Sequence, residues 1–277
     1  YSIDYQYQNQ APFDNFGESM GTSSGLPYYT KGMVWVGGYL YVIDGNYNYL
    51  RKYHIEDNSL VEDSWGYLES SSYGITYDGE YLWIVDYSGG EIRAYDLDLN
   101  YQSQIPYIES PISDENAIAF DGDYFIVNDW NDSTPTFYRI DYDGTIIESF
   151  NYDYNNAGYY YAWESVWVGG HLIITDSYNY WNIKKLSLSE GVATVIESAD
   201  LPYNSTQYPI AFDGVDLWVG GYTNYTLYQL GSGLIDWLSI IPSSGSIAPD
   251  STNSIQVTFD PTGISFGDYY ANILISS

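Results

Sequence analysis

The sequence predicts an all-β protein. Aromatic residues make up 19% of the 277 residues, and Gly, Asn, Ser and Thr are abundant, a composition that favours strands and turns. No long segment repeats its apolar residues with the 3.6-residue period of a helix. Instead, a pattern of apolar strand, tight Asp-Gly or Gly-Gly turn and second apolar strand recurs along the chain, as in "ITYDGEYLWIVD" from Ile75.

Five copies of this pattern are present, and each continues with a polar turn and a third strand. The spacings between their turn glycines are 41, 43, 48 and 44 residues, the period expected of one four-stranded propeller blade. These glycines are Gly38, Gly79, Gly122, Gly170 and Gly214. We therefore expect a five-bladed β-propeller over residues 1–231, with six blades as the alternative.

The fourth strand of each blade is predicted between copies, at "SLVEDSW", "YQSQI", "TIIESF" and "ATVIESA". The fifth copy ends at Leu230 without one. Because a ring must close to remove its sheet edges, we expect residues 2–8 to pair with the third strand of the last blade.

The blade opening resembles that of the NHL, YncE and SMP-30-like propellers, in which "DG-x-x-LW-V-x-D" is familiar. The resemblance covers about residues 1–230 and implies the architecture. It implies no particular activity, because such blades serve enzymes, receptors and scaffolds alike.

The tail over residues 234–277 breaks the repeat and is expected to form three or four strands. It resembles the C-terminal half of bacterial Ig-like domains of the BACON and ASPM-SPD-2-Hydin kind, in its "WLSIIPSSG" and "GDYYANILIS" stretches. The N-terminal half of that family is absent, which implies an incomplete β-sandwich that either leans on the propeller or takes strands from another chain; we prefer contact with another chain. The residues expected at this contact are Trp237, Leu238, Ile255, Val257, Tyr269, Tyr270, Ile273 and Ile275.

Composition excludes several classes of function. A net charge of −30 disfavours nucleic acid, no apolar run is long enough for a membrane span, and cysteine is absent. The chain starts at Tyr1 without a signal sequence, so we expect an extracellular or cell-surface protein whose signal peptide has been removed. Candidate glycosylation sequons lie at Asn131, Asn204 and Asn224, a number that chance alone would produce.

Residues for catalysis are scarce. The two histidines, His54 and His171, occupy non-equivalent positions, and no nucleophile, zinc-protease or P-loop motif occurs. The sequence therefore predicts a protein that is not an enzyme and has no cofactor except, as one option, calcium. The calcium candidates are Asp96, Asp98 and Asn100 in "DLDLN", and Asp129 and Asn131 in "DWNDS".

The few cations also follow the repeat. Six of the seven lie in third strands, where we expect surface ion pairs with carboxylates, and Lys31 alone lies elsewhere. The six are Arg51, Lys52, Arg93, Arg139, Lys184 and Lys185. The strand tryptophans are expected in the blade core; they are Trp35, Trp83, Trp167 and Trp218.

Loop tyrosines are the remaining candidates for a binding or assembly surface, with plain surface positions as the alternative. They are Tyr47, Tyr49, Tyr159, Tyr160, Tyr178 and Tyr180. The preferred hypothesis is a non-enzymatic structural subunit of an extracellular assembly or filament, with self-association or other surface proteins as partners. The alternatives are a secreted propeller that binds glycan or protein ligands, and a metal-assisted propeller hydrolase or lyase.

Overall fold

The computed structural model describes residues 2–3, 16–86, 90–110, 112, 115–129, 136–153, 162–176, 182–201, 209–220, 225–233, 238–241, 245–246 and 256–259. These residues form strands and turns, and no helix occurs among them. Accordingly, no helix in the described part of the chain could cross a membrane. The chain divides into two compact units: Phe16–Ser232, and Tyr1–Asn15 together with Gly233–Ser277.

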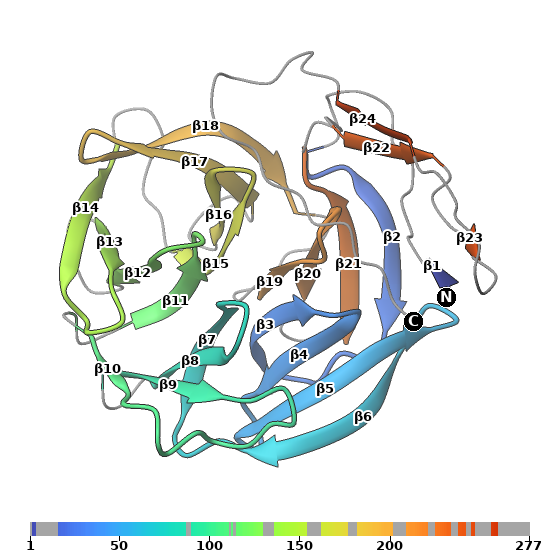
Figure 1. Cartoon of the computed structure of the whole chain (residues 1–277), viewed down its shortest axis with the longest axis horizontal. Helices are drawn as coiled ribbons and strands as arrows, with labels where there is room; N and C mark the ends of the chain where they lie inside the picture. The colour runs from blue at the N-terminus through green and yellow to red at the C-terminus, as the bar shows by residue number, and fades with distance from the viewer. Residues whose placement is uncertain are drawn as a thin grey trace. The chain divides into compact units, whose positions relative to one another are not determined.

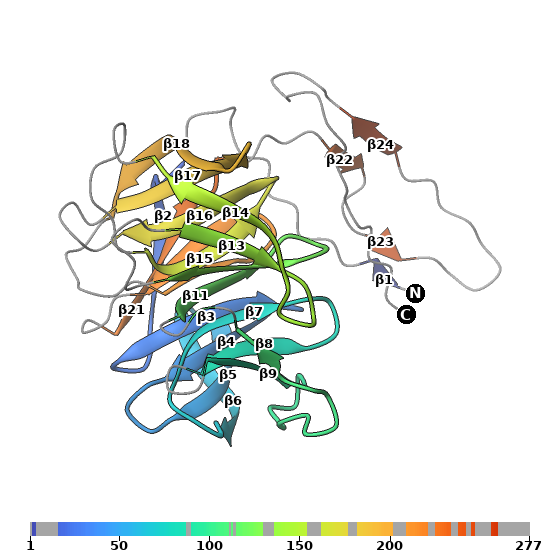
Figure 2. The ribbon, with the colours of Figure 1, turned by 90° about the vertical axis from the view of Figure 1, so that its left-hand side faces the viewer.

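The larger unit is a ring of four-stranded antiparallel sets around a common centre (Figure 1). In the first four sets the chain runs from an inner strand outward, and the strands cross the thickness of the ring (Figure 2). The first set is β3 (Thr30–Val36), β4 (Tyr39–Asp44), β5 (Tyr49–Glu56) and β6 (Ser59–Tyr67); the second is β7 (Ser72–Tyr77), β8 (Leu82–Asp86), β9 (Glu91–Tyr95) and β10 (Ile108–Glu109).

The third set is β11 (Glu115–Phe120), β12 (Phe125–Asp129), β13 (Thr136–Ile140) and β14 (Ile146–Tyr152), and the fourth is β15 (Ala162–Val168), β16 (His171–Asp176), β17 (Asn182–Ser189) and β18 (Val192–Asp200). The last set contains β19 (Ile210–Phe212), β20 (Asp216–Gly220) and β21 (Thr226–Gly231), and its outer strand is β2 (Ser19–Ser24). Parallel pairing of outer strands, β14 with β18 and β2 with β6, joins four of the sets into two eight-stranded sheets.

The repeated turn glycines all lie in the left-handed region, with φ between 84° and 108°. A Cβ atom at any of them would meet no other atom, so the backbone conformation and not crowding requires glycine there. In the Asp-Gly turns the aspartate stabilises the loop as well: Asp78 Oδ1 accepts the N–H groups of Glu80 and Tyr81, both at 2.8 Å. The predicted hairpins are therefore confirmed.

The N-terminal part of the chain does complete the last set, but with other residues than predicted. The strand that pairs with β21 is β2, in a register that places Ser23 opposite Leu227. The predicted pairing of residues 2–8 is wrong: Ser2–Ile3 forms β1, which pairs with β23 (Gly245–Ser246). An outer strand needs no apolar alternation, and most of β2 is exposed, so "SMGTSS" gave no strand signal.

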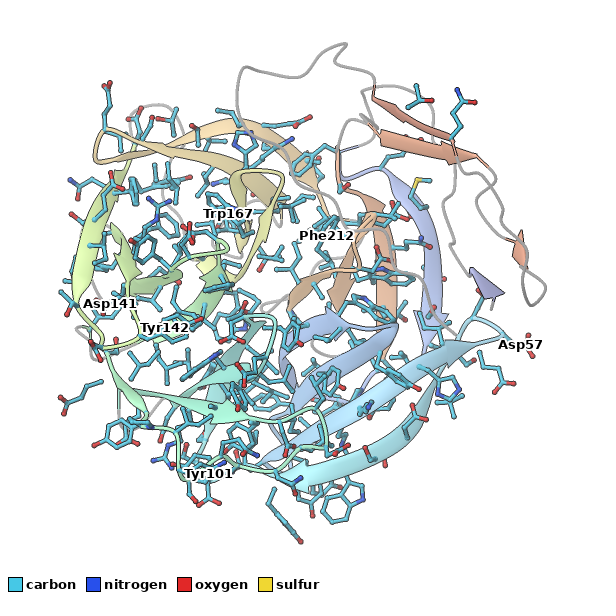
Figure 3. All side chains as sticks on the ribbon, in the orientation of Figure 1. Asp57, Tyr101, Asp141, Tyr142, Trp167 and Phe212 are labelled. Carbon is cyan, nitrogen blue, oxygen red and sulfur yellow. The ribbon has the colours of Figure 1, made fainter. Side chains whose placement is uncertain are left out.

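The core lies between neighbouring sets. Five apolar clusters each combine residues of two adjacent sets, for example Tyr41 and Ile43 with Ile84 and Tyr95. The strand tryptophans belong to these clusters: Trp83 and Trp218 are buried, and Trp35 and Trp167 are half-buried and pack against them. Trp167 and Phe212 lie toward the centre of the ring, whereas Tyr101 and Asp57 lie at its outer border (Figure 3).

Five of the third-strand cations make the ion pairs expected of them. Arg51, Arg93, Arg139 and Lys185 are partly exposed and pair with carboxylates, although those of Asp44, Asp86 and Asp121 are themselves nearly buried. Lys184 is the exception to the surface location, because it is buried with its Nζ 2.5 Å from Asp176 Oδ2 and 3.1 Å from the hydroxyl of Tyr152. The repeat thus predicted the ion pair of Lys184 but not its burial.

The described residues of the smaller unit form two two-stranded sheets. One pairs β22 (Leu238–Ile241) with β24 (Gln256–Phe259), so that Ile240 lies opposite Val257, and the other pairs β1 with β23. Leu238 and Val257 of the predicted contact surface therefore lie on paired strands. The other six residues of that surface are outside the described residues: Trp237, Ile255, Tyr269, Tyr270, Ile273 and Ile275.

Candidate functional site

A pocket of about 390 Å³ lies where the last set meets the first. Its lining comes from the loop between β2 and β3, the end of β4, the β4–β5 turn, β5 and the residue before β21. The lining residues are Pro27, Tyr28, Asp44, Asn46, Tyr47, Arg51, Tyr53 and Tyr225. The pocket thus combines four phenol rings with the polar groups of Asp44, Asn46 and Arg51, and it is open to solvent.

Arg51 carries the polar part of the pocket. Its Nε donates to Asp44 Oδ2 at 2.8 Å, and its Nη1 pairs with Glu62. Asp44 is itself buried and accepts the backbone N–H of Asn46 at 3.0 Å. One guanidinium therefore meets two carboxylates, and the pocket offers fixed acceptors and donors without a free positive charge.

The walls of the pocket are tyrosines. Tyr28 and Tyr225 face each other with ring centroids 5.7 Å apart. Tyr53 hydrogen-bonds Glu62 Oε2 at 3.3 Å, and burial raises the pKa of its hydroxyl. Because Tyr28 and Tyr225 are 42% and 53% exposed, a ligand could reach both rings from solvent.

An exposed aromatic ladder continues from the pocket across the first set. Tyr47 stacks on Tyr49 with centroids 5.8 Å apart, and Tyr49 stacks on Trp65 at 4.6 Å with the rings inclined by 21°. Tyr67 meets Tyr49 edge-on at 5.0 Å. Tyr47, Trp65 and Tyr67 are 65%, 47% and 67% exposed, so most of this ladder faces solvent.

The strand geometry explains the ladder. Residues two apart on a strand share one face, so Tyr49 and Arg51 lie on the same side of β5, opposite Tyr67 and Trp65 of β6 in the antiparallel register. The guanidinium carbon of Arg51 lies 5.2 Å from the centroid of Tyr49 and 5.9 Å from that of Tyr47, within cation–π range. Arg51 thus connects the floor of the pocket to the ladder.

Of the loop tyrosines predicted to bind, Tyr47 and Tyr49 belong to this site. Tyr159, Tyr160, Tyr178 and Tyr180 lie outside the described residues. Sequence analysis missed Tyr28, Trp65, Tyr67 and Tyr225. For Trp65 and Tyr67 a signal was present. In "WGY" they lie two residues apart, as Tyr49 and Arg51 do in "YLR", and the two stretches belong to adjacent strands of one hairpin.

Outside the pocket and the ladder, the inner strand β15 carries a buried acid, Glu164. Its side chain is fully buried, Oε1 accepts the N–H of Ser165 at 3.3 Å, and the backbone of Ile118 on β11 also donates to the carboxyl group. Among the residues that the structure describes, none hydrogen-bonds Oε2. Burial disfavours the charged carboxylate and raises the pKa of Glu164 well above its ordinary value. The sequence signal for this buried acid was a glutamate within the otherwise largely apolar strand "AWESVWV".

The calcium candidates are only partly described. Asp96 uses its carboxylate within its own turn: Oδ1 accepts the backbone N–H groups of Asp98 and Asn100, at 3.0 and 2.8 Å, and Oδ2 accepts Gln102 Nε2 at 2.8 Å. Among the residues that the structure describes, no group of three or more His, Asp or Glu side chains is placed to hold a metal ion. Asp129 ends β12, its side chain is not described, and Asn131 lies outside the described residues.

The remaining sequence candidates add no second cluster. His54 Nδ1 lies 2.8 Å from Asp63 Oδ2 at the surface. His171 is partly buried, and burial together with the charge of Lys185 lowers its pKa. The sequons at Asn131, Asn204 and Asn224 lie outside the described residues.

The chain matches no family model and no curated protein sequence. Its fold is similar to that of several solved structures. A glutaminyl cyclase of Myxococcus xanthus is 12% identical and has a TM-score of 0.63; the match covers 79% of this chain and 97% of that one. A luciferin-regenerating enzyme is 13% identical with a TM-score of 0.52, covering 76% and 95%. A calcium-binding regucalcin of Agrobacterium tumefaciens is 12% identical with a TM-score of 0.49, covering 79% and 94%.

These similarities establish the β-propeller fold that the repeat predicted. They also correct the expectation that the chain is not an enzyme, because two of the solved proteins with this fold are enzymes. That expectation was based on the scarcity of familiar catalytic motifs. Such motifs indicate only the chemistry of known families, whereas one fold can support many different activities.

Proposed function

We propose that the larger unit binds a neutral glycan, with one sugar in the tyrosine pocket and further sugars along the aromatic ladder. The observation that carries this proposal is the exposed stack of Tyr47, Tyr49 and Trp65 beside the pocket. Exposing three large rings to water is unfavourable for the free protein, and a flat apolar face of a sugar would cover them.

The polar floor of the pocket supports a hydroxylated ligand over a purely apolar one. Asp44 provides acceptors, and the side-chain amide of Asn46 provides both a donor and an acceptor. Arg51 also lines the pocket, and its ion pairs with Asp44 and Glu62 hold the guanidinium in place. A sugar ring matches this combination because it carries C–H groups on its faces and hydroxyl groups around its edge.

Charge supports a neutral ligand. The chain has a net charge of −30, and the guanidinium at the pocket is already balanced by two carboxylates. A uronate, sulfate or phosphate group would therefore meet repulsion at long range and no free cation at short range. This argument separates neutral glycans from acidic ones.

The experiment is a calorimetric titration of the full chain with a panel of neutral oligosaccharides of increasing length, and with acidic ones of matched length. We expect affinity to rise with length until the ladder is covered. Trp65→Ala and Tyr225→Ala should each weaken binding about 5- to 10-fold, the effect of losing one aromatic contact.

Tyr107→Ala is the matched control, because Tyr107 is a similarly exposed tyrosine, at 46%, away from the pocket. It should bind like the wild type. Binding to none of the neutral glycans, or equal affinity in the Trp65 and Tyr107 variants, would refute the proposal.

Finer architectural statements are part of the same proposal. Each four-stranded set is taken as one blade, which gives a five-bladed ring closed by β2, and the smaller unit is taken as an incomplete Ig-like module that contacts another chain outside the cell. Support comes from the set-by-set topology and from the sequence resemblance of the tail. Sedimentation of the full chain and of a chain ending at Gly233 tests the contact: loss of self-association on truncation is expected, and two monomers would refute it.

A further inference from the structure

Lys31 is the one cation that sequence analysis found outside the third strands, and its surroundings are also different. It lies on the inner strand β3 and is only 5% exposed. Its Nζ donates to Ser71 Oγ at 3.1 Å and lies 3.8 Å from the ring centroid of Tyr73 and 5.7 Å from that of Tyr29. No carboxylate of the described residues is within ion-pairing distance of this ammonium group.

Lys184 provides the comparison. It has the same exposure, 5%, but pairs with Asp176 at 2.5 Å and reaches the hydroxyl of Tyr152 as well. An ammonium group has three donors, and burial without an anion costs several kcal/mol. A buried lysine that pairs with none of the described carboxylates is a site at which an anion from outside would be stabilised.

Three local features of the backbone accommodate Lys31 at this buried position. Gly45 gives room for the lysine stem, because a Cβ at that position would lie 2.7 Å from Lys31 Cε and 2.5 Å from Tyr29 Cδ1. The register between β3 and β4 shifts between Thr30 and Met33, and such bulges re-aim side chains. Tyr29 has a φ of 67°, which brings a non-glycine residue into the left-handed region beside the lysine.

The buried acid Glu164 makes no ion pair with this ammonium group. A Cβ at Gly32, the residue after Lys31, would lie 2.8 Å from Glu164 Oε2. Glu164 and Lys31 are nevertheless not within ion-pairing distance of each other, and burial raises the pKa of Glu164. Trp163 packs on Tyr73 with centroids 5.9 Å apart, so a second aromatic ring lies beside the one that the ammonium contacts.

We propose that Lys31 and Ser71 bind the carboxylate of a small monoanion, whose apolar part packs on Tyr73. One ammonium and one hydroxyl match the charge and donors that a single carboxylate requires. A multiply charged anion fits less well, because the whole chain repels negative charge. This site involves none of the residues of the proposed glycan site.

The test is the thermal unfolding midpoint of the full chain in increasing propionate, at constant ionic strength, with propionamide as the neutral analogue. Propionate should raise the midpoint because it binds the folded state, and propionamide should not. Lys31→Met should lose the response, with at least tenfold weaker binding. Lys52→Met is the matched control, since Lys52 also lies over tyrosine rings, at 4.3 Å from Tyr39, and should respond like the wild type.

A measurement on the wild-type chain keeps the test decisive if Lys31→Met does not fold. In a spectrum of lysine side chains labelled with ¹³C at Cε, propionate should shift the Lys31 signal and leave that of Lys52 in place. The proposal is overturned if propionate changes neither the midpoint nor the Lys31 signal, or if Lys31→Met responds as the wild type does.

Discussion

Glu164 and Lys31 would carry opposite charges in water, yet both are buried in the ring without an ion pair. Burial disfavours the charged form of each, so it raises the pKa of the acid and lowers the pKa of the amine. Groups whose environments shift their pKa values toward neutrality often carry function. The charge state of these two side chains therefore depends on the groups packed around them as well as on the residue type.

Glu164→Gln should remove a pH dependence of stability. The folded-state pKa of Glu164 lies above its unfolded value, so its stabilising contribution is complete below the unfolded pKa, about 4.3, and declines as the pH rises toward the folded pKa. The variant should therefore be more stable than the wild type at pH 7 to 8, and this difference should shrink as the pH falls to about 4. Urea unfolding of both proteins across this range measures it, and parallel stability curves would contradict the expectation.

The strand β2 is determined by its neighbours more than by its own residues. Its exposed strand has no apolar alternation, but Gly25 donates to Tyr225 O at 3.1 Å on one side, and Ser24 donates to Asn58 O at 3.1 Å on the other. Successive N–H groups of a strand point in opposite directions, so Ser23 N–H faces β21 like that of Gly25. The element exists because two neighbouring strands each lack a partner on that edge.

Ser23→Pro should therefore open the last set. Proline removes the N–H that faces β21 and should cost about 1 to 3 kcal/mol of the free energy of unfolding, because the acceptor on β21 is left unsatisfied. Thr22→Pro is the control, because the N–H of Thr22 faces away from β21, and its loss should be smaller. Deleting residues 1–10 should leave the unfolding of the ring nearly unchanged. Chemical denaturation measures all three, and equal losses for the two proline variants would argue against β2 as the closing strand.

The whole molecule concentrates its few cations in the ring. All seven Lys and Arg residues lie on described strands, from Lys31 on β3 to Lys185 on β17, while 37 acidic residues give the chain its charge of −30. Each cation is thus part of a hydrogen-bonded ladder, where a protease cannot bind an extended segment without local unfolding.

Native trypsin digestion should accordingly be slow. We expect the intact chain to persist under conditions in which the urea-unfolded chain is cleaved completely, and no cut can occur after Lys185 because no Lys or Arg follows it. Mass spectrometry of the digest at several times is the measurement. Rapid native cleavage at Arg93 or Arg139 would show that β9 and β13 open far more readily than the rest of the ring.

Properties that depend on residues close together in the chain were accessible from the sequence alone. The strand alternation and the positive-φ glycines are set by local backbone geometry and recur with the repeat, and cations recur in four of the third strands. Tyr47 and Tyr49 were accessible in the same way, because they lie two residues apart, in the turn before β5 and at its first position. These features predicted the fold and part of the candidate site.

Only the tertiary structure decided which distant segments meet. Closing the ring brings Tyr28 against Tyr225 and gives β21 its partner, although nearly the whole propeller sequence separates them. The same closure buries Glu164 of the fourth set beside Gly32 of the first. The physical reason is that strand periodicity is a property of neighbouring residues, whereas pockets, burial and the loss of an ion partner arise from packing between sets, which no single segment encodes.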